Sequence, residues 1–125
     1  IGMPSSSAVD DVEQAGTDEL VARYAAAARR HGQATVTGTH TANADAVEIA
    51  AIYRELRSRR KQSALLPLLD VDEPGVQAWA GAHALEFAPE EGEPVLARLA
   101  EGDDLMAFDA KITLREWQAG RLRFP

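Results

Sequence analysis

Residues 65–85 read LLPLLDVDEPGVQAWAGAHAL, and the interpretation of this stretch decides the fold. An apolar run is followed by an acidic turn and by Pro74, a residue that suits the first turn of a helix. Small side chains surround Trp79 along the expected helix of residues 74–87, and Gly81 costs about 1 kcal/mol relative to Ala in a helix interior. The stretch therefore predicts a helical hairpin whose small residues admit a neighbouring helix at close range.

A weak repeat of this hairpin follows thirty residues later. The apolar run matches a segment thirty residues later in the chain. The helix that follows the run matches a segment twenty-nine residues later. Each copy has one apolar face, which must stack on a neighbour to be stable. The matched residues of the second helix are Val76, Ala78, Trp79, Gly81 and Leu85 with Leu105, Ala107, Phe108, Ala110 and Leu114.

Helical periodicity extends to the N-terminal side of the hairpin. Apolar residues three to four positions apart predict one helix over residues 17–32, capped by Thr17 and ended by Gly32, and a second helix over residues 41–58. The segment of residues 33–39 between them is rich in Gly and Thr and is expected to form a loop.

The same periodicity predicts the remaining helix boundaries. A short apolar helix is expected over residues 62–69, another helix opens at Pro89, and a last one is capped by Asp103 or Asp104 and closes at Gly120. This last helix carries apolar residues on two of its sides.

Two stretches resemble known families. Residues 65–85 resemble a HEAT-type repeat, and the run from YRELR at residues 53–57 to FDAKITLREW at residues 108–117 is similar to a small bacterial family catalogued as a domain of unknown function. The resemblance spans residues 20–122 and implies a HEAT-like, right-handed helical stack. It implies no activity, because none is assigned to that family. Gln77 stands where an Arg is expected after the proline, so no regular ladder of Asp–Arg pairs is expected.

We therefore expect a single all-α domain over residues 17–125. It would form a right-handed α-α superhelix of about six helices, with two degenerate HEAT-like hairpins. Residues 1–16 are rich in Ser, Pro and acids and are expected to form a flexible N-terminal arm, and Ile1 and Gly2 are expected to be additions ahead of Met3.

The composition narrows the classes of function. The chain has 125 residues, 46% hydrophobic and 26% charged, which fits one globular domain. Its formal net charge of -7 disfavours nucleic acid as a partner and favours a cationic one. The absence of cysteine excludes disulfides and thiolate chemistry. No apolar run approaches the ~20 residues of a membrane span, and no secretion signal is recognisable, so a cytoplasmic location away from membranes is expected.

One group of binding candidates is basic. Arg54, Arg57 and Lys61 share one side of the predicted helix 41–58 and its end, within a run of five cations. They predict either a docking patch for an anion or acidic partner, or a solvated helix end that complements the helix dipole.

A second group lies on the helices of the hairpins. Trp79 and His83 are one turn apart and could line a groove, or His83 could be a buried, hydrogen-bonded histidine. Asp109, Lys111 and Arg115 form the most specific polar cluster, because the resemblance includes these residues. They could form a structural lock, in which Asp109 bonds Thr113 or a neighbouring helix, or a binding site.

A third group is acidic. The segments 70–73, 90–93 and 101–104 all fall at connections between predicted helices and could gather on one edge as a negative strip for a basic protein. Helix capping and solubility are the alternative. No segment has a calcium-loop pattern, and His31, His40 and His83 are too scattered for zinc, so no metal or cofactor is expected.

These features favour a non-enzymatic module that binds a protein partner through a groove or the acidic edge. One version is an immunity or regulatory protein that neutralises a basic toxin or enzyme. The enzyme alternative is a relative of HEAT-like nucleic-acid base glycosylases, for which Trp79, Trp117 and Asp109 are candidate residues. A third possibility is a homodimer that buries the end of the helical stack.

Overall fold

The computed structural model describes residues 12–37 and 42–124, and over these ranges the chain forms helices and no strands. The predicted all-α class is confirmed. Within the described ranges, none of the helices combines the length and the apolar character of a membrane span. In chain order the elements are α2 (Thr17–Thr37), α3 (Ala42–Ser58), the 3-10 helix η1 (Gln62–Asp70), α4 (Pro74–Phe87), α5 (Pro89–Leu99) and α6 (Leu105–Gln118).

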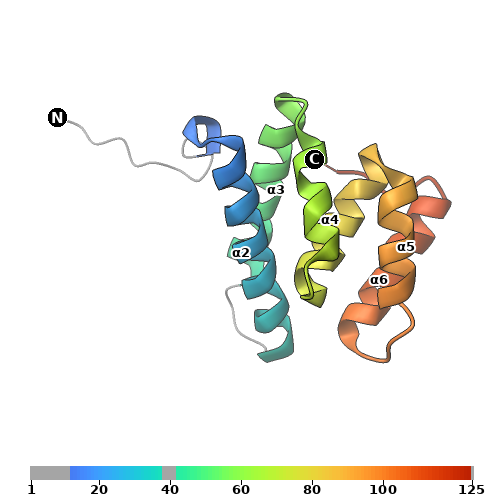
Figure 1. Ribbon diagram of the computed structural model, residues 1–125. Helices are drawn as coiled ribbons and strands as arrows, with labels where there is room; N and C mark the ends of the chain where they lie inside the picture. The colour runs from blue at the N-terminus through green and yellow to red at the C-terminus, as the bar shows by residue number, and fades with distance from the viewer. Residues whose placement is uncertain (1–11, 38–41, 125) are drawn as a thin grey trace.

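Helix α4 occupies the middle of the fold. It packs against η1, α2, α5 and α6, whereas the α2–α3 pair lies on one side of it and the α5–α6 pair on the other (Figure 1). The predicted hairpin of residues 62–87 therefore exists as η1 followed by α4. Its first element is a 3-10 helix that contains Pro67, a residue without the N–H that an α-helix would use.

The local boundary signals predicted several helix ends correctly. Pro74 and Pro89 open α4 and α5. Asp104 caps α6, since its Oδ1 accepts a hydrogen bond of 2.8 Å from the backbone N–H of Ala107. Gly120, just beyond the end of α6, has a φ of 74°, the left-handed conformation that glycine adopts readily.

The predicted end of α2 at Gly32 is wrong. The helix continues to Thr37, so residues 33–37 are helical where a loop was expected, and residues 38–41 lie outside the described part of the chain. Gly32 instead marks a close crossing of two helices. A Cβ built on Gly32 would lie 3.4 Å from the Cα of Gly75 in α4.

The expected N-terminal arm is described only from residue 12 onward. In that part Val12 is 2% exposed and Ala15 is 8% exposed, so the chain packs onto the domain where a solvated arm was expected. Arg59, the residue after α3, donates hydrogen bonds of 3.2 Å to the backbone oxygens of Val12 and Glu13. These bonds fix the segment against α3.

The core lies between α2, α3, η1 and α4. The predicted stripes are buried there, including Leu20 and Tyr24 of α2 and Ile49 and Ile52 of α3. The two apolar sides of α6 have different environments. Ala110, with Leu114 and Trp117, packs on a smaller cluster around Leu85 and Leu96 of α4 and α5, whereas the side that carries Leu105, Phe108 and Ile112 faces outward.

A buried histidine joins three helices at the centre of this core. His83 of α4 is 3% exposed, and its Nδ1 lies 2.6 Å from the hydroxyl oxygen of Tyr24 of α2, in hydrogen-bond contact. The ring of Tyr53 of α3 stacks on the imidazole at 3.9 Å between centroids and 8° between planes. Phe124 covers the imidazole at 4.9 Å. The predicted alternative of a buried, hydrogen-bonded His83 is confirmed.

The surroundings of His83 favour its neutral form. Burial lowers the pKa of His83 to about 3, and the positive charge of Arg57 acts in the same direction. Arg57 lies 5.5 Å from the centroid of the Tyr53 ring and pairs with Glu86 at 3.3 Å. The Tyr53 hydroxyl also donates to Glu86, so the rim of the cluster is closed by polar contacts.

The protein should become less stable in mild acid, because the unfolded chain binds a proton at His83 that the folded protein does not. The folded pKa of His83 lies below the unfolded value of 6.5, so its contribution is complete above about pH 6.5 and is lost as the pH falls toward 3. The free energy of unfolding should drop by roughly 1.4 kcal/mol per pH unit in this window because of His83 alone. Urea unfolding between pH 7 and pH 4 measures it.

The double variant Tyr24→Phe/His83→Phe is the control for the carboxylates that also titrate in this range. It removes both partners of the hydrogen bond together, so that neither is left buried and unpaired. Its unfolding free energy should fall less steeply with pH than that of the wild type. Equal slopes would show that His83 does not titrate on unfolding.

A seam of small residues joins α4 to α5. A Cβ on Gly81 would lie 3.2 Å from Cγ of Leu96, which confirms the crowded contact predicted at this glycine. The approach is closer still at Gly92 of α5, where a Cβ would lie 2.5 Å from the backbone oxygen of Gly81 and 2.9 Å from Cβ of Ala84. The two backbones could not hold this distance with a larger residue at position 92.

Gly92→Ala should therefore lower the free energy of unfolding by about 1–3 kcal/mol, because the added methyl group forces α5 away from α4. Gly16→Ala is the matched control, since a Cβ there meets nothing within 4 Å. Urea unfolding at neutral pH measures both. A similar effect of the two substitutions would contradict the close contact at Gly92.

Candidate functional site

A cavity of about 300 Å³ opens between α2, α4 and α6. The side chains of Trp79, Met106 and Ile112 form its apolar surface. The glycines and alanines of the facing helices have small side chains and leave the space of the cavity. We call it the groove. The residues that line it are His31, Gly32, Gly75, Ala78, Trp79, Ala82, Met106, Asp109, Ile112 and Thr113.

Helical spacing brings these residues to one place. On α4, Gly75, Ala78 and Ala82 recur at intervals of three and four residues and share a face with Trp79. Their small side chains leave the volume that the groove occupies. The crossing of α2 and α4 contributes Gly32 and Gly75 to the lining, and the two backbones approach closely there.

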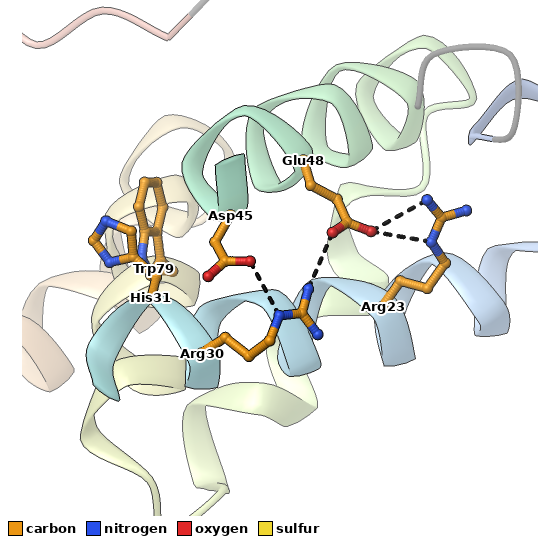
Figure 2. Close-up of polar contacts among 6 residues, drawn as sticks. All are labelled: Arg23, Arg30, His31, Asp45, Glu48 and Trp79. Carbon is orange, nitrogen blue, oxygen red and sulfur yellow. Dashed lines mark hydrogen bonds and ion pairs between the residues drawn. The ribbon is translucent and has the colours of Figure 1, made fainter. Parts of the chain in front are cut away.

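Trp79 is oriented by a partner on α2. Its indole N–H donates to Nδ1 of His31 at 3.3 Å, and the two rings meet edge to face at 5.2 Å between centroids (Figure 2). The indole is half-buried. A tryptophan fixed in this way presents a rigid apolar surface, which lowers the entropy cost of binding.

Asp109 supplies the carboxylate of the groove. It is exposed on α6, and no ion pair to it is present in the described part of the chain. Thr113 does bond it, as one reading of the sequence expected, but through the backbone: the Thr113 hydroxyl donates to the Asp109 carbonyl oxygen at 2.9 Å. Because Asp109 is exposed, its carboxylate is accessible to a cation.

An ion-pair network fixes the α2 wall of the groove to α3. Arg30 binds Asp45 at 3.0 Å and Glu48 at 3.2 Å, and Arg23 binds Glu48 at 3.2 Å (Figure 2). Asp45 is 5% exposed, and its Oδ2 accepts no hydrogen bond within the described residues. Loss of Arg30 would leave a buried charge uncompensated, next to the turn that carries His31.

A second ion pair links α2 to the start of α4. Arg29 donates two hydrogen bonds to the carboxylate of Glu73, the residue before Pro74. The hydrogen bond from Arg29 lowers the pKa of Glu73; desolvation opposes this shift, and the positive charge of Arg29 adds to it. The pair is on the surface, so it orients α4 more than it stabilises it.

The structure brings together two of the predicted binding residues, Trp79 and Asp109. His83 does not line the groove, because it points into the core one turn further along α4. Lys111 and Arg115 are exposed on α6 but do not line the groove either.

The basic candidates lie at the far end of α3 from the groove-lining part of α2. Arg54 and Lys61 are exposed, whereas Arg57 is engaged with Glu86 and with the Tyr53 ring. Of the three predicted binding cations, Arg57 therefore makes its contacts within the domain.

The three acidic segments do not gather on one edge. The turn of residues 71–73 before α4 and the turn of residues 100–104 before α6 lie at the same end of the helices, because α4 and α6 run in the same direction (Figure 1). The acids of residues 90–93 lie at the opposite end, in the first turns of α5. A continuous acidic strip is thus absent from the described surface.

The geometry does not favour the glycosylase alternative. Trp117 packs on the cluster of Leu85, Leu96 and Ala110 and does not line the groove. Asp109 does line it, but an exposed carboxylate lacks the desolvation that a general base in a closed base pocket requires. His40 lies outside the described residues, and among the described ones no three or more His, Asp or Glu side chains are clustered so that they could hold a metal.

Sequence reasoning missed most of the groove. His31, Met106, Ile112 and Thr113 carry no motif, and they meet Trp79 only because three helices pack together. Gly32 is the one signal in the sequence for this site, because a glycine at that position permits the close crossing of α2 and α4.

Comparisons with protein-family models, with curated proteins and with solved structures found no match to this chain. The resemblance to a HEAT-like family therefore stays a prediction.

Proposed function

We propose that this protein is a non-enzymatic interaction module that receives an apolar side chain of a cationic protein partner in the groove between α2, α4 and α6. The observation that carries the proposal is the groove itself, about 300 Å³ with Trp79, Met106 and Ile112 in its lining and Asp109 at its rim. This volume is at the small end of ligand pockets and suits one large side chain of a partner.

A side chain that enters a pocket of its partner often lies at the centre of a protein interface. A few residues in a central, desolvated pocket provide most of the binding free energy, and tryptophan is enriched among them. Trp79 has the properties of such a residue, because it is half-buried and held by His31. A partner side chain that enters the groove would contact the indole without reordering it.

The charge of the chain favours a cationic partner. The formal net charge is -7, and the charged group in direct reach of the groove is the carboxylate of Asp109. A basic toxin or enzyme that is regulated by this protein would fit, because opposite charge accelerates association and excludes acidic competitors.

We further propose that the helical arrangement belongs to the HEAT-like α-α superhelices. The pairing of η1 with α4 and of α5 with α6, with antiparallel neighbours, supports this assignment. In such stacks, binding commonly uses surfaces formed by successive helical pairs, and the groove lies between α4 and α6 of successive pairs.

The experiment fills the groove. Wild-type protein immobilised at low salt is used to recover a partner from a lysate of the source organism, and the purified partner is then titrated calorimetrically. Ala82→Phe places a ring in the groove and should weaken binding at least about tenfold. Asp109→Asn should weaken it less and reduce its dependence on salt.

Ala97→Phe is the matched control, since Ala97 is exposed on α5 and does not line the groove. It should bind the partner as the wild type does, and circular dichroism checks that all variants remain helical. Equal affinity of Ala82→Phe and the wild type, or recovery of no partner at low salt, would refute the proposed function.

A further inference from the structure

We propose that two copies of this chain pair through the outer faces of their α6 helices, antiparallel and related by a twofold axis near Phe108. The inference concerns a surface that adjoins the groove and shares Ile112 with it, and it does not depend on the proposed function. It rests on an exposed apolar ridge and on the order of charges along it.

The ridge consists of Leu105, Phe108 and Ile112, spaced three and four residues apart on one side of α6. Their exposed fractions are 57%, 56% and 39%. Among the described residues, the remaining large apolar side chain that is exposed is Val47, which stands alone on α3. Three such residues in a row on one helix form an apolar patch of the kind that marks an interface.

The charges beside the ridge change sign along the helix. Glu101, Asp103 and Asp104 are exposed at the N-terminal end of α6. Lys111 and Arg115 are exposed toward its C-terminal end. Asp104, Phe108, Lys111 and Arg115 recur at helical intervals, so the acid and the two bases lie along the same flank of the ridge.

This order is complementary to itself when one copy is reversed. About an axis at Phe108, Asp104 and Ile112 are equally distant, so the acidic end of each copy lies beside the basic end of the other. Parallel copies would instead place acids beside acids and bases beside bases. A twofold pair uses the same patch on both copies, which is the commonest arrangement of homodimers.

The pairing leaves most of the groove lining outside the interface. Met106, Asp109 and Thr113 lie on the side of α6 that faces α4, beside the ridge, whereas Ile112 belongs to both the ridge and the lining. In a twofold antiparallel pair this side falls on the same side of both helices. The dimer would therefore present two grooves together, and a partner with two anchors would gain affinity from the second one.

The dimer should be reversible. Helix α6 has 14 residues, a length of about 21 Å, so one helix from each copy buries less than the roughly 1,200 Å² of a stable interface. Sedimentation equilibrium of the full chain, from low micromolar to millimolar concentration, should show a monomer in equilibrium with a dimer. A monomer at every concentration would overturn the proposal.

Variants test the ridge and the charges separately. Phe108→Asp should weaken the dimer at least about tenfold, whereas Val47→Asp should leave it unchanged. Lys111→Glu/Arg115→Glu and Glu101→Lys/Asp103→Lys should each dimerise at least about tenfold more weakly than the wild type, and an equal mixture of the two should recover dimers. These positions are exposed, so the variants should fold, and circular dichroism checks this. No recovery in the mixture would refute the role of the charges.

Disulfide trapping tests the orientation, because the chain has no cysteine of its own. A mixture of Leu105→Cys and Ile112→Cys should form a mixed disulfide on mild oxidation, since these positions meet only in antiparallel copies. Disulfides that form within each variant alone, and not between the two, would indicate parallel pairing and overturn the proposal. Failure of these tests leaves partner binding by the groove, measured with Ala82→Phe, unaffected.

Discussion

The contact between Tyr24 and His83 organises the domain. It joins α2 to α4 inside the core, and the stacked ring of Tyr53 adds α3 to the same point. A buried hydroxyl or imidazole without its partner would cost about 1–3 kcal/mol, so the helices that carry these residues cannot shift independently. Because Trp79 lies one turn before His83 on α4, the same constraint positions the indole that forms the wall of the groove.

The groove and the core thus share one rigid helix. One face of α4 carries Val76, Ala80 and Ala84 into the interior, and another carries Ala78 and Ala82 along the groove. The alanines suit both faces of α4. On the interior face they let neighbouring helices approach closely, and on the groove face they leave the space of the cavity. Binding on such a surface needs little rearrangement of the backbone.

The sequence predicts features that a residue imposes on its own backbone, but it does not predict contacts between residues far apart in the chain. Pro74, Pro89 and Asp104 act on their own backbone, and their predictions were correct. Gly32 was misread, because a glycine at that spacing fits either a helix end or a crossing, and Gly75, far along the chain, decides between them. Pairs such as Arg30 with Asp45 and Trp79 with His31 likewise depend on how helices meet, which no local pattern encodes. Residues 105–114 repeat the pattern of residues 76–85, but α6 lies at the edge of the row and leaves its outer side exposed.

The position of Phe124 has a consequence for how the molecule loses its structure. A linear array of helical pairs can unravel from either end, since each pair contacts only its neighbours. Here the segment after α6 turns back toward the middle of the domain, and Phe124 meets Tyr53 at 5.9 Å as well as His83 (Figure 1). Fraying from the α6 side must first withdraw this ring from the interior, which links melting of the last helix to melting of α3 and α4 and favours all-or-none denaturation.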